Sequence, residues 1–259
     1  MNKPEGPSAS SESAKFKDLF SRQSADYSKF RPTYPTELFE YLATLVDKRD
    51  LAWDVGTGNG QSAVMVANHF SRVVATDPSI KQIERATPNS RVIYHVGAAE
   101  SSEFADHTVD LVTVAQAIHW FNHEKFFNEV RRVLKPKGVL AFWCYGGAQI
   151  TPEVNAVVRK LYLDILGPYW QPERRLIEEG YRSIRVPMQE ITPPDFSITA
   201  DWELEHLIGY LGTWSALQSY IEKNKSNPLE AMYEQLRTAW GKISTHRVQW
   251  ELNLRVARN

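Results

Sequence analysis

The chain has 259 residues, 42% hydrophobic and 24% charged, and this composition excludes a chain that is disordered throughout. Its net charge of −1 and the lack of a basic block disfavour nucleic acid as a partner. The single cysteine, Cys144, excludes a disulfide framework and a cysteine-based zinc site. No apolar run approaches the roughly 18 residues of a membrane span, and the N-terminus lacks a signal peptide's apolar segment, so we expect a cytoplasmic protein that does not bind membranes.

The first part of the chain alternates between strand and helix patterns. Residues 1–14 are polar and serine-rich, which predicts a flexible tail. Thr36 is predicted to cap a helix over residues 38–46. The patterns that follow predict strands over 51–55, 73–77, 92–96, 109–115 and 139–143, helices over 61–70, 79–86 and 123–134, and a turn over 135–138.

The pattern changes after about residue 150. Residues 152–180 look helical, residues 182–198 look extended, and residues 204–222 and 228–240 look helical again. Residues 248–256 alternate between apolar and polar side chains, which predicts a half-buried antiparallel strand. The earlier strands are apolar on both faces and alternate with helices, so the sequence predicts an α/β fold with a doubly wound, mostly parallel sheet.

A glycine-rich loop follows the first predicted strand. Its sequence, Asp54-Val55-Gly56-Thr57-Gly58-Asn59-Gly60, permits a sharp turn and a close approach of the backbone to a ligand at a helix N-terminus. Asp77 ends the second strand, where a carboxylate is placed to accept both hydroxyls of a ribose. The dinucleotide pattern requires a small residue where this chain has Gln61, so a nicotinamide or flavin enzyme is disfavoured; a glycine turn without a ligand remains the other alternative.

Further segments support one family in particular. Besides the loop over 54–60 they are 27–35, 76–79, 97–100, 115–121 and 134–138. Together these segments resemble the class I S-adenosylmethionine-dependent methyltransferases, and among them the group that contains the trans-aconitate methyltransferases. The resemblance is strong over residues 27–143 and fainter beyond, where residues 212–215 match best.

The resemblance implies a Rossmann-like methyltransferase fold with helical cap insertions. Residues 15–150 would form the S-adenosylmethionine-binding α/β domain with an N-terminal lid segment, and residues 151–259 the substrate-cap helices and closing strands of the same domain. It also implies cofactor-binding roles for Tyr27, Arg31, Asp54, Gly56, Gly58, Asp77, Ala99, Glu100 and Gln116. Many relatives carry Asp where this chain has Ala98, so adenine recognition is expected to rest on backbone groups and stacking.

Aromatic residues and one histidine are candidates for the acceptor pocket. His119 follows the fourth strand and either acts as a base, orients the acceptor, or is held by the backbone at the start of a helix. The predicted pocket residues are Tyr34, His119, Trp120, Tyr145 and Trp214, for which core packing is the alternative. Residues 171–179 are predicted to form a solvated face, and Cys144 to be a buried, small hydrophobic residue.

The chemistry that these features predict is methyl transfer to a small molecule. The methyl donor is already activated, so the protein mainly aligns the reacting atoms and excludes water, and no metal is expected. The absence of a convincing base motif favours carboxyl O-methylation, in which Gln116 and His119 are the candidate catalytic residues. A phenol or amine acceptor and a non-catalytic S-adenosylmethionine-binding protein remain alternatives, and the oligomeric state stays open.

Overall fold

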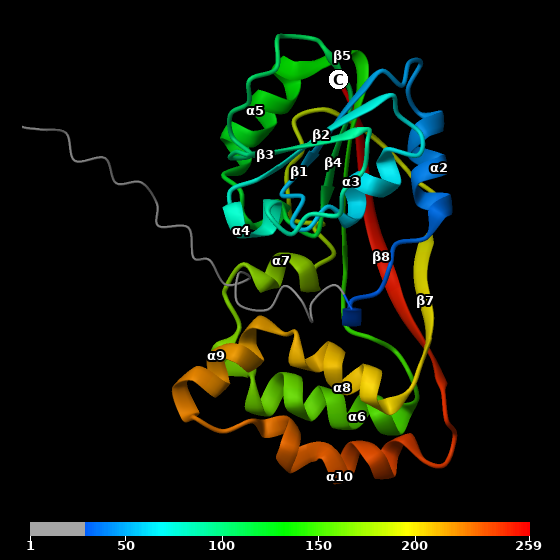
Figure 1. The fold of residues 1–259 in the computed structure, drawn as a ribbon, viewed down its shortest axis with the longest axis vertical. Coiled ribbons are helices and arrows are strands. Elements are labelled where there is room, and N and C mark those ends of the chain that lie inside the picture. The colour runs from blue at the N-terminus through cyan, green and yellow to red at the C-terminus, as the bar shows by residue number, and fades with distance from the viewer. Residues whose placement is uncertain (1–28) are drawn as a thin grey trace, which may run out of the picture.

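The computed structural model of the protein describes residues 29–259, which contain one mixed sheet (Figure 1). The strand order is β3-β2-β1-β4-β5-β8-β6, and β7 also pairs with β8. The parallel strands are β1 (Leu51–Val55), β2 (Arg72–Asp77), β3 (Val92–Val96), β4 (Val109–Ala115) and β5 (Leu134–Tyr145). The antiparallel strands are β6 (Gln189–Ile191), β7 (Phe196–Trp202) and β8 (His246–Arg258). The predicted α/β fold with a mostly parallel sheet and an antiparallel C-terminal strand is confirmed.

Helices cover both faces of the sheet. The apolar core on one face includes side chains of α2 (Thr36–Thr44) and α3 (Gln61–Val66), and the core on the other face includes α5 (His123–Val133) and α7 (Arg174–Glu178). Short helices follow two of the strands: α4 (Ile80–Ile83) after β2, and the 3-10 turn η1 (Ile118–Trp120) after β4. Each face therefore has its own core, as a buried parallel sheet requires.

Strand β5 shows how one strand supplies both cores. Val139, Ala141 and Trp143 lie in the core with α2 and α3, whereas Leu140 and Phe142 lie in the core with α5. Successive side chains of a strand point to opposite faces, so an uninterrupted apolar run is what a strand covered on both sides needs. Each large side chain that is fully buried in this way contributes about 1.5–3 kcal/mol relative to an exposed one.

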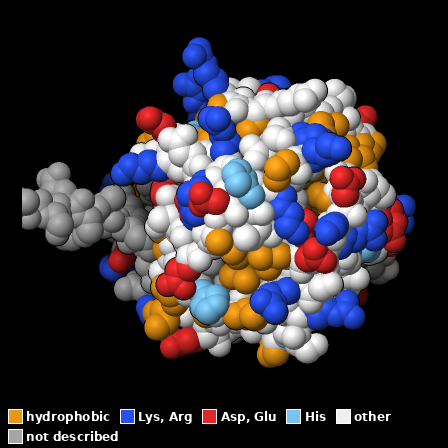
Figure 2. Space-filling view, turned by 90° about the horizontal axis from the view of Figure 1, so that it is seen from above, with side chains coloured by type: hydrophobic (Ala, Val, Ile, Leu, Met, Phe, Trp, Pro, Cys, Tyr) orange, Lys and Arg blue, Asp and Glu red, His pale blue; other side chains and the backbone are white. Residues whose placement is uncertain are grey.

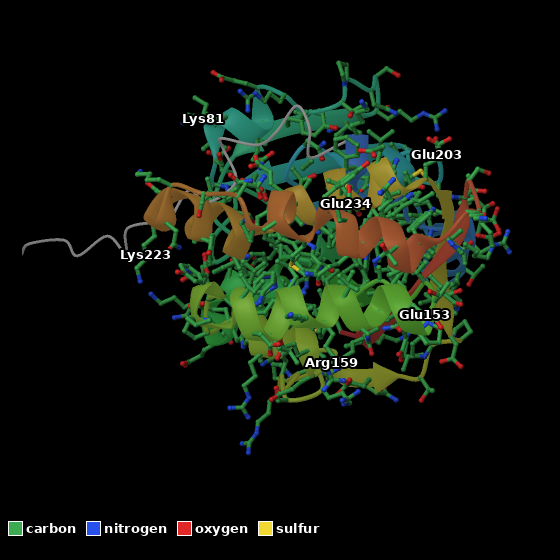
Figure 3. All side chains as sticks on the ribbon, turned by 90° about the horizontal axis from the view of Figure 1, so that it is seen from below. Lys81, Glu153, Arg159, Glu203, Lys223 and Glu234 are labelled. Carbon is green, nitrogen blue, oxygen red and sulfur yellow. The ribbon has the colours of Figure 1, made fainter. Side chains whose placement is uncertain are left out.

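A layer of helices, which we call the cap, lies beyond one end of the sheet (Figure 1). In this view β5 runs down toward the cap, so the carboxyl ends of the parallel strands face it. Figure 3 looks at the cap from below, and the exposed Glu153, Arg159, Lys223 and Glu234 are on its helices. The cap consists of α6 (Pro152–Lys160), the turns η2 (Leu161–Ile165) and η3 (Gly167–Tyr169), α8 (Leu204–Gly212), α9 (Ser215–Asn224) and α10 (Pro228–Trp240).

Several predicted boundaries differ from the structure. Helix α2 begins at Thr36 itself, and Pro35 occupies the N-cap position without a side-chain hydrogen bond. The predicted turn over 135–138 lies within β5, where the register against β4 shifts and Lys137 has a positive φ of 67°. The predicted helix over 152–180 is divided near Gly167 and Pro168, because proline cannot continue a helix from its interior. The predicted helix over 204–222 is likewise divided, into α8 and α9.

The surface at the other end of the sheet is shown in Figure 2, which looks down on the molecule from above. Positive and negative side chains are interspersed there around a small apolar area. Within residues 29–259, no helix combines the length and the apolar character that are needed to cross a membrane.

Candidate active site

The glycine-rich loop joins β1 to α3 at the carboxyl edge of the sheet. Gly58 has a φ of +56°, and no atom of the described residues lies within 4 Å of the position where a Cβ would stand. Its backbone N–H donates to Oδ2 of Asp77 over 2.9 Å. The loop thus has a left-handed backbone that favours glycine and open space on one side, which a ligand can fill.

Asp54 lies beneath this loop and is fully buried. Its Oδ1 accepts a hydrogen bond from Thr113 Oγ1 at 2.5 Å, and its Oδ2 accepts one from Thr57 Oγ1 at 2.6 Å. Burial raises the pKa of the Asp54 carboxyl, against the opposing effect of the threonine hydrogen bonds. The carboxylate connects the loop to β4, which favours a role in shaping the site; the predicted contact with the cofactor stays a prediction.

Asp77 ends β2 next to the loop. Its Oδ1 accepts the backbone N–H of Ser79 at 2.9 Å, while Oδ2 accepts that of Gly58. The carboxylate is thereby fixed between the starts of two connecting segments, at the position where the sequence predicts a ribose-binding residue.

Two of the predicted cofactor-binding residues, Ala99 and Glu100, follow β3. Ala99 is buried, and Glu100 is half-buried with its Oε1 accepting the N–H of Asn122 at 2.8 Å. Asn122 is the N-cap of α5, so the Glu100 side chain connects this loop to the start of a helix. The neighbouring Ala98 is exposed.

Gln116 follows β4 with a φ of +55°, which is unusual for a residue other than glycine. Its Oε1 accepts the N–H of Tyr145 at 2.8 Å, and its Nε2 donates to the Tyr145 carbonyl oxygen at 3.3 Å. Its own N–H donates to the carbonyl oxygen of Trp143. These bonds fix the side chain across the ends of β4 and β5, and such fixed, uncommon backbone conformations concentrate at functional sites.

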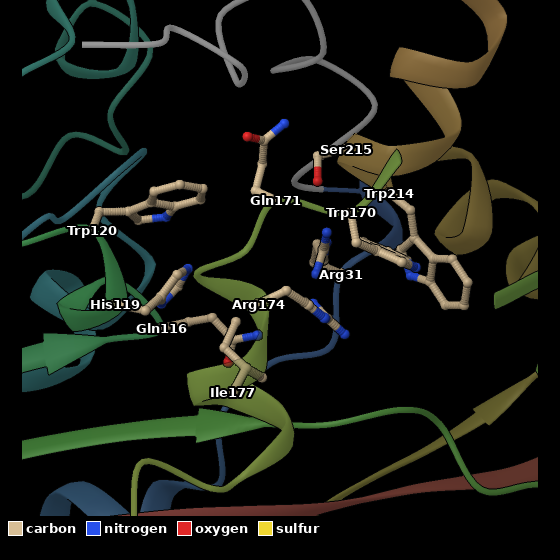
Figure 4. A pocket seen from close by; sticks show the side chains of 10 residues that line it. All are labelled: Arg31, Gln116, His119, Trp120, Trp170, Gln171, Arg174, Ile177, Trp214 and Ser215. Atoms are coloured by element: carbon tan, nitrogen blue, oxygen red, sulfur yellow. The ribbon is translucent and has the colours of Figure 1, made fainter. Parts of the chain in front are cut away.

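A pocket of about 580 Å³, counting the space open to solvent, lies between the sheet and the cap (Figure 4). Gln116 and His119 lie on one side of the view, with Trp170 and Trp214 on the other and Arg174 between. The lining residues are Arg31, Gln116, His119, Trp120, Trp170, Gln171, Arg174, Ile177, Trp214 and Ser215.

His119 is positioned in this pocket by η1. Its Nδ1 is 2.8 Å from the hydroxyl oxygen of Tyr181, which is fully buried. Burial, followed by the positive charges of Arg174 and His123, lowers the pKa of His119 to about 3. The imidazole is therefore neutral at neutral pH and a weak base.

The structure brings together five of the predicted site residues as pocket lining: Arg31, Gln116, His119, Trp120 and Trp214. Tyr34 and Tyr145 do not line it. The hydroxyl of Tyr145 accepts a hydrogen bond from Arg31 Nη1 at 3.3 Å, while Tyr34 packs edge-on against Trp143. Arg31 Nη2 also donates to the Thr213 carbonyl oxygen at 3.4 Å, which connects the chain before α2 to the cap.

Tyr27 lies outside the described residues, as do residues 1–14.

The sequence interpretation missed one wall of the pocket. Residues 171–179 were predicted to form a solvated face, yet Gln171, Arg174 and Ile177 line the pocket, and Ile177 is buried. The prediction was wrong because α7 has one exposed and one buried face: Arg174 and Ile177 are three residues apart and lie on the same side, whereas Arg175 is exposed. That spacing, directly after Trp170, was a usable signal.

Comparison with known proteins identifies the family. A family model described as a methyltransferase domain matches residues 53–142. A protein of Dictyostelium discoideum named as a methyltransferase is 38% identical over 230 residues, covering 87% of this chain and 88% of its own. A protein of Saccharomyces cerevisiae named as an S-adenosylmethionine-dependent methyltransferase is 27% identical, covering 80% and 83%.

A solved structure extends the match to the fold. A protein of Anaeromyxobacter dehalogenans described as a type II methyltransferase superposes with a TM-score of 0.82 at 39% identity, covering 88% of this chain and 97% of that one. The similarity thus includes the cap as well as the glycine loop. The chain belongs to the methyltransferase domain family, and it is a class I S-adenosylmethionine-dependent methyltransferase.

Proposed function

We propose that the protein methylates a carboxylate of a small organic acid. The observation that carries the proposal is the buried imidazole of His119, whose pKa is lowered by burial to about 3; among the described residues, the other ionisable side chains that line the pocket are two arginines. A base this weak removes a proton from a phenol or an ammonium group inefficiently. A carboxylate is already ionised at neutral pH and needs no base.

The donor side fits S-adenosylmethionine. Asp77 is fixed by two backbone N–H groups at the end of β2, the position at which a ribose-binding carboxylate is expected, and the space beside Gly58 is open to a ligand. When bound, the donor supplies an activated methyl group: a carboxylate oxygen forms a bond to that carbon as the carbon–sulfur bond breaks, and its electron pair stays on sulfur. The chain's own contribution is to hold the acceptor in line and to exclude water.

In this proposal, Gln116 and His119 orient the acceptor. The Gln116 amide is fixed by Tyr145 and the His119 ring by Tyr181, so neither side chain has to be ordered when a ligand arrives. Preorganised groups cost little conformational entropy at the moment of reaction. The three tryptophans that line the pocket, Trp120, Trp170 and Trp214, support an organic molecule as acceptor.

The test is methyl transfer from radiolabelled S-adenosylmethionine to a panel of organic acids, phenols and amines. A carboxyl methyl ester releases labelled methanol on mild alkaline treatment, whereas methyl ethers and methylamines keep the label. We expect base-labile product with acids only. Base-stable label on phenols or amines would refute carboxyl methylation.

His119→Asn sharpens this test. If His119 only orients the acceptor, turnover should fall about tenfold and the pH profile should stay flat near neutrality. The matched control is Tyr181→Phe, which leaves the imidazole in place but removes its hydroxyl partner. It should reduce turnover less than His119→Asn does. A loss of several orders of magnitude, with disappearance of an ionisation near neutral pH, would make His119 a base and favour a phenol or amine acceptor.

A further inference from the structure

The turn that follows α7 has an unusual backbone conformation. Gly180 and Tyr181 both have a φ of +59°, which is common for glycine but rare for a residue with a bulky side chain. A Cβ at Gly180 would lie 2.5 Å from Oδ1 of Asn253, so the turn lies directly against β8. Such conformations persist only where the surrounding structure enforces them, and they concentrate at functional sites.

Arg255 of β8 holds this turn in place. Its Nη1 donates to the carbonyl oxygens of Tyr181 and Ile184, each at 2.6 Å. Its Nη2 donates to both carboxylate oxygens of Glu190 on β6 at 2.7 Å, and its Nε donates to one of them at 3.1 Å. The side chain of Arg255 is only 15% exposed. Because the donors of a guanidinium have fixed directions, Arg255 connects two strands to one defined position of the turn.

The turn places the Tyr181 phenol in the core beside His119. Tyr181 is fully buried, and its hydroxyl oxygen is 2.8 Å from Nδ1 of His119. Burial raises the pKa of the phenol well above its ordinary value, so the hydroxyl keeps its proton, and the backbone N–H of His119 donates to its oxygen. Within residues 29–259 this hydroxyl has no other hydrogen-bond partner.

These contacts favour one tautomer of the neutral imidazole. If Nδ1 carried the ring proton, it would donate to a hydroxyl that already accepts the backbone N–H, and the buried phenol proton would have no acceptor. If Nε2 carries the ring proton, the phenol donates to Nδ1 and each of these groups is paired. Nε2 itself has no partner among the described residues, and His119 lines the pocket, so a proton on Nε2 is available to a ligand.

We propose that Tyr181 and Arg255 are positioning residues that fix His119 in the tautomer with its proton on Nε2, so that the pocket offers a neutral N–H donor. The matching ligand group is an oxygen with a lone pair, as in a carboxylate, whereas an ammonium group carries only donors and would not pair. With the lone pair of Nδ1 directed at Tyr181, no ring nitrogen is left to accept a proton from the ligand. This use of the donor rests on the proposed carboxyl methylation, but the tautomer can be measured without any acceptor.

The experiment determines which ring nitrogen carries the proton. The ¹⁵N chemical shift of an imidazole nitrogen depends strongly on whether that nitrogen is protonated. Spectra are recorded at neutral pH on protein labelled with ¹⁵N-histidine and loaded with S-adenosylhomocysteine, and the signals that disappear in His119→Asn are those of His119. In the wild type we expect a protonated Nε2 and an unprotonated Nδ1, with this tautomer predominating by about tenfold or more.

Tyr181→Phe removes the hydroxyl but keeps the ring. Both tautomers of His119 should then be populated, and the shifts of its two nitrogens should move toward each other. If half of the molecules present the donor, KM for the acceptor should rise about twofold with kcat nearly unchanged.

Arg255→Gln loosens the turn and should change the tautomer ratio in the same direction. Arg255→Lys keeps the charge but not the planar donors, so it should retain part of the wild-type ratio. The matched control is Arg247→Gln, which removes an exposed arginine of the same strand that pairs with Asp201, and it should leave the ratio intact. Unchanged S-adenosylhomocysteine affinity and thermal midpoint show that each variant is folded.

The outcomes separate this inference from the proposed function. A protonated Nδ1 in the wild type, or a ratio that Tyr181→Phe leaves unchanged, would overturn the role of Tyr181. A wild-type ratio in Arg255→Gln would overturn the role of Arg255; if that variant does not fold, a wild-type ratio in both Arg255→Lys and Glu190→Gln would do so. None of these results affects carboxyl methylation, which is judged by base-labile product. The expected tautomer with base-stable product alone would support the positioning residues and refute carboxyl methylation.

Discussion

The proposed donor side and the proposed acceptor side of the site are constructed differently. On the proposed donor side, Gly58 lies in the loop that follows β1, Asp77 ends the neighbouring β2, and the backbone N–H of Gly58 donates to the Asp77 carboxylate. On the acceptor side, η1, α7 and the cap each contribute side chains that are far apart in the sequence. A site formed by backbone groups needs glycines at fixed positions, so it is visible in the sequence as a motif. A site formed by side chains from distant elements has no such motif. Three predictions test that contrast.

The largest effect is expected at Gly58. In Gly58→Val the new side chain would enter the open space beside the loop, and valine would be strained at the positive φ of this position, so S-adenosylmethionine binding should be lost. Calorimetry measures the binding. The matched control is Gly241→Val at the end of α10, where φ is +79° and no described atom lies within 4 Å: it should lower the free energy of unfolding but preserve binding. Normal binding by a folded Gly58→Val protein would remove this loop from the donor site.

The next effect concerns Asp77. Asp77→Ala should weaken S-adenosylmethionine binding by about 1.5–3 kcal/mol, or ten- to a hundredfold, since charge-assisted hydrogen bonds to two hydroxyls are lost. Asp77→Asn keeps one side-chain oxygen that can accept a backbone N–H, so it should lose less affinity for S-adenosylmethionine than Asp77→Ala. Asp201→Ala, an exposed carboxylate on β7, serves as the control. Equal affinities for wild type and Asp77→Ala would show that the ribose is held elsewhere.

The smallest effect is a pH dependence of stability at His119. The pKa of its imidazole is about 3 in the folded protein and 6.5 as its ordinary value, so the unfolded chain takes up the proton first as the pH falls. The stabilising contribution is complete above pH 6.5 and is lost as the pH falls toward 3; it amounts to about 2 kcal/mol between pH 8 and pH 5. Urea unfolding of His119→Asn should lack this component.

Tyr181→Phe tests whether burial or the hydroxyl of Tyr181 lowers the pKa of His119. Burial is the largest contribution at His119, and this variant keeps the ring buried, so the pH dependence should persist. An identical pH dependence in wild type and His119→Asn would show that the imidazole is accessible to protons, and would reopen its role as a base.

The sequence predicted the sheet well because buried parallel strands are short apolar runs between glycines and charges. The predicted bounds of β1, β3 and β4 agree with the structure. The cap was harder, because the breaks near Gly167 and between α8 and α9 depend on tertiary packing as well as on local preference. Arg174 was missed for a related reason: a charged residue in a charged stretch is ordinarily solvated, and only folding places it against Trp170.

The hairpin of β7 and β8 has a consequence for how acceptor preference can diversify. Residues Trp202 and His246 are paired in this hairpin, so residues 203–245 leave and re-enter the sheet at adjacent positions. This segment carries α8, α9 and α10, including Trp214 and Ser215 of the pocket. A stretch with such closely spaced ends can be lengthened, shortened or replaced as a module without altering the register of β8 against β5. Exchange of that module between homologues is therefore a route by which one donor-binding sheet can acquire new acceptors.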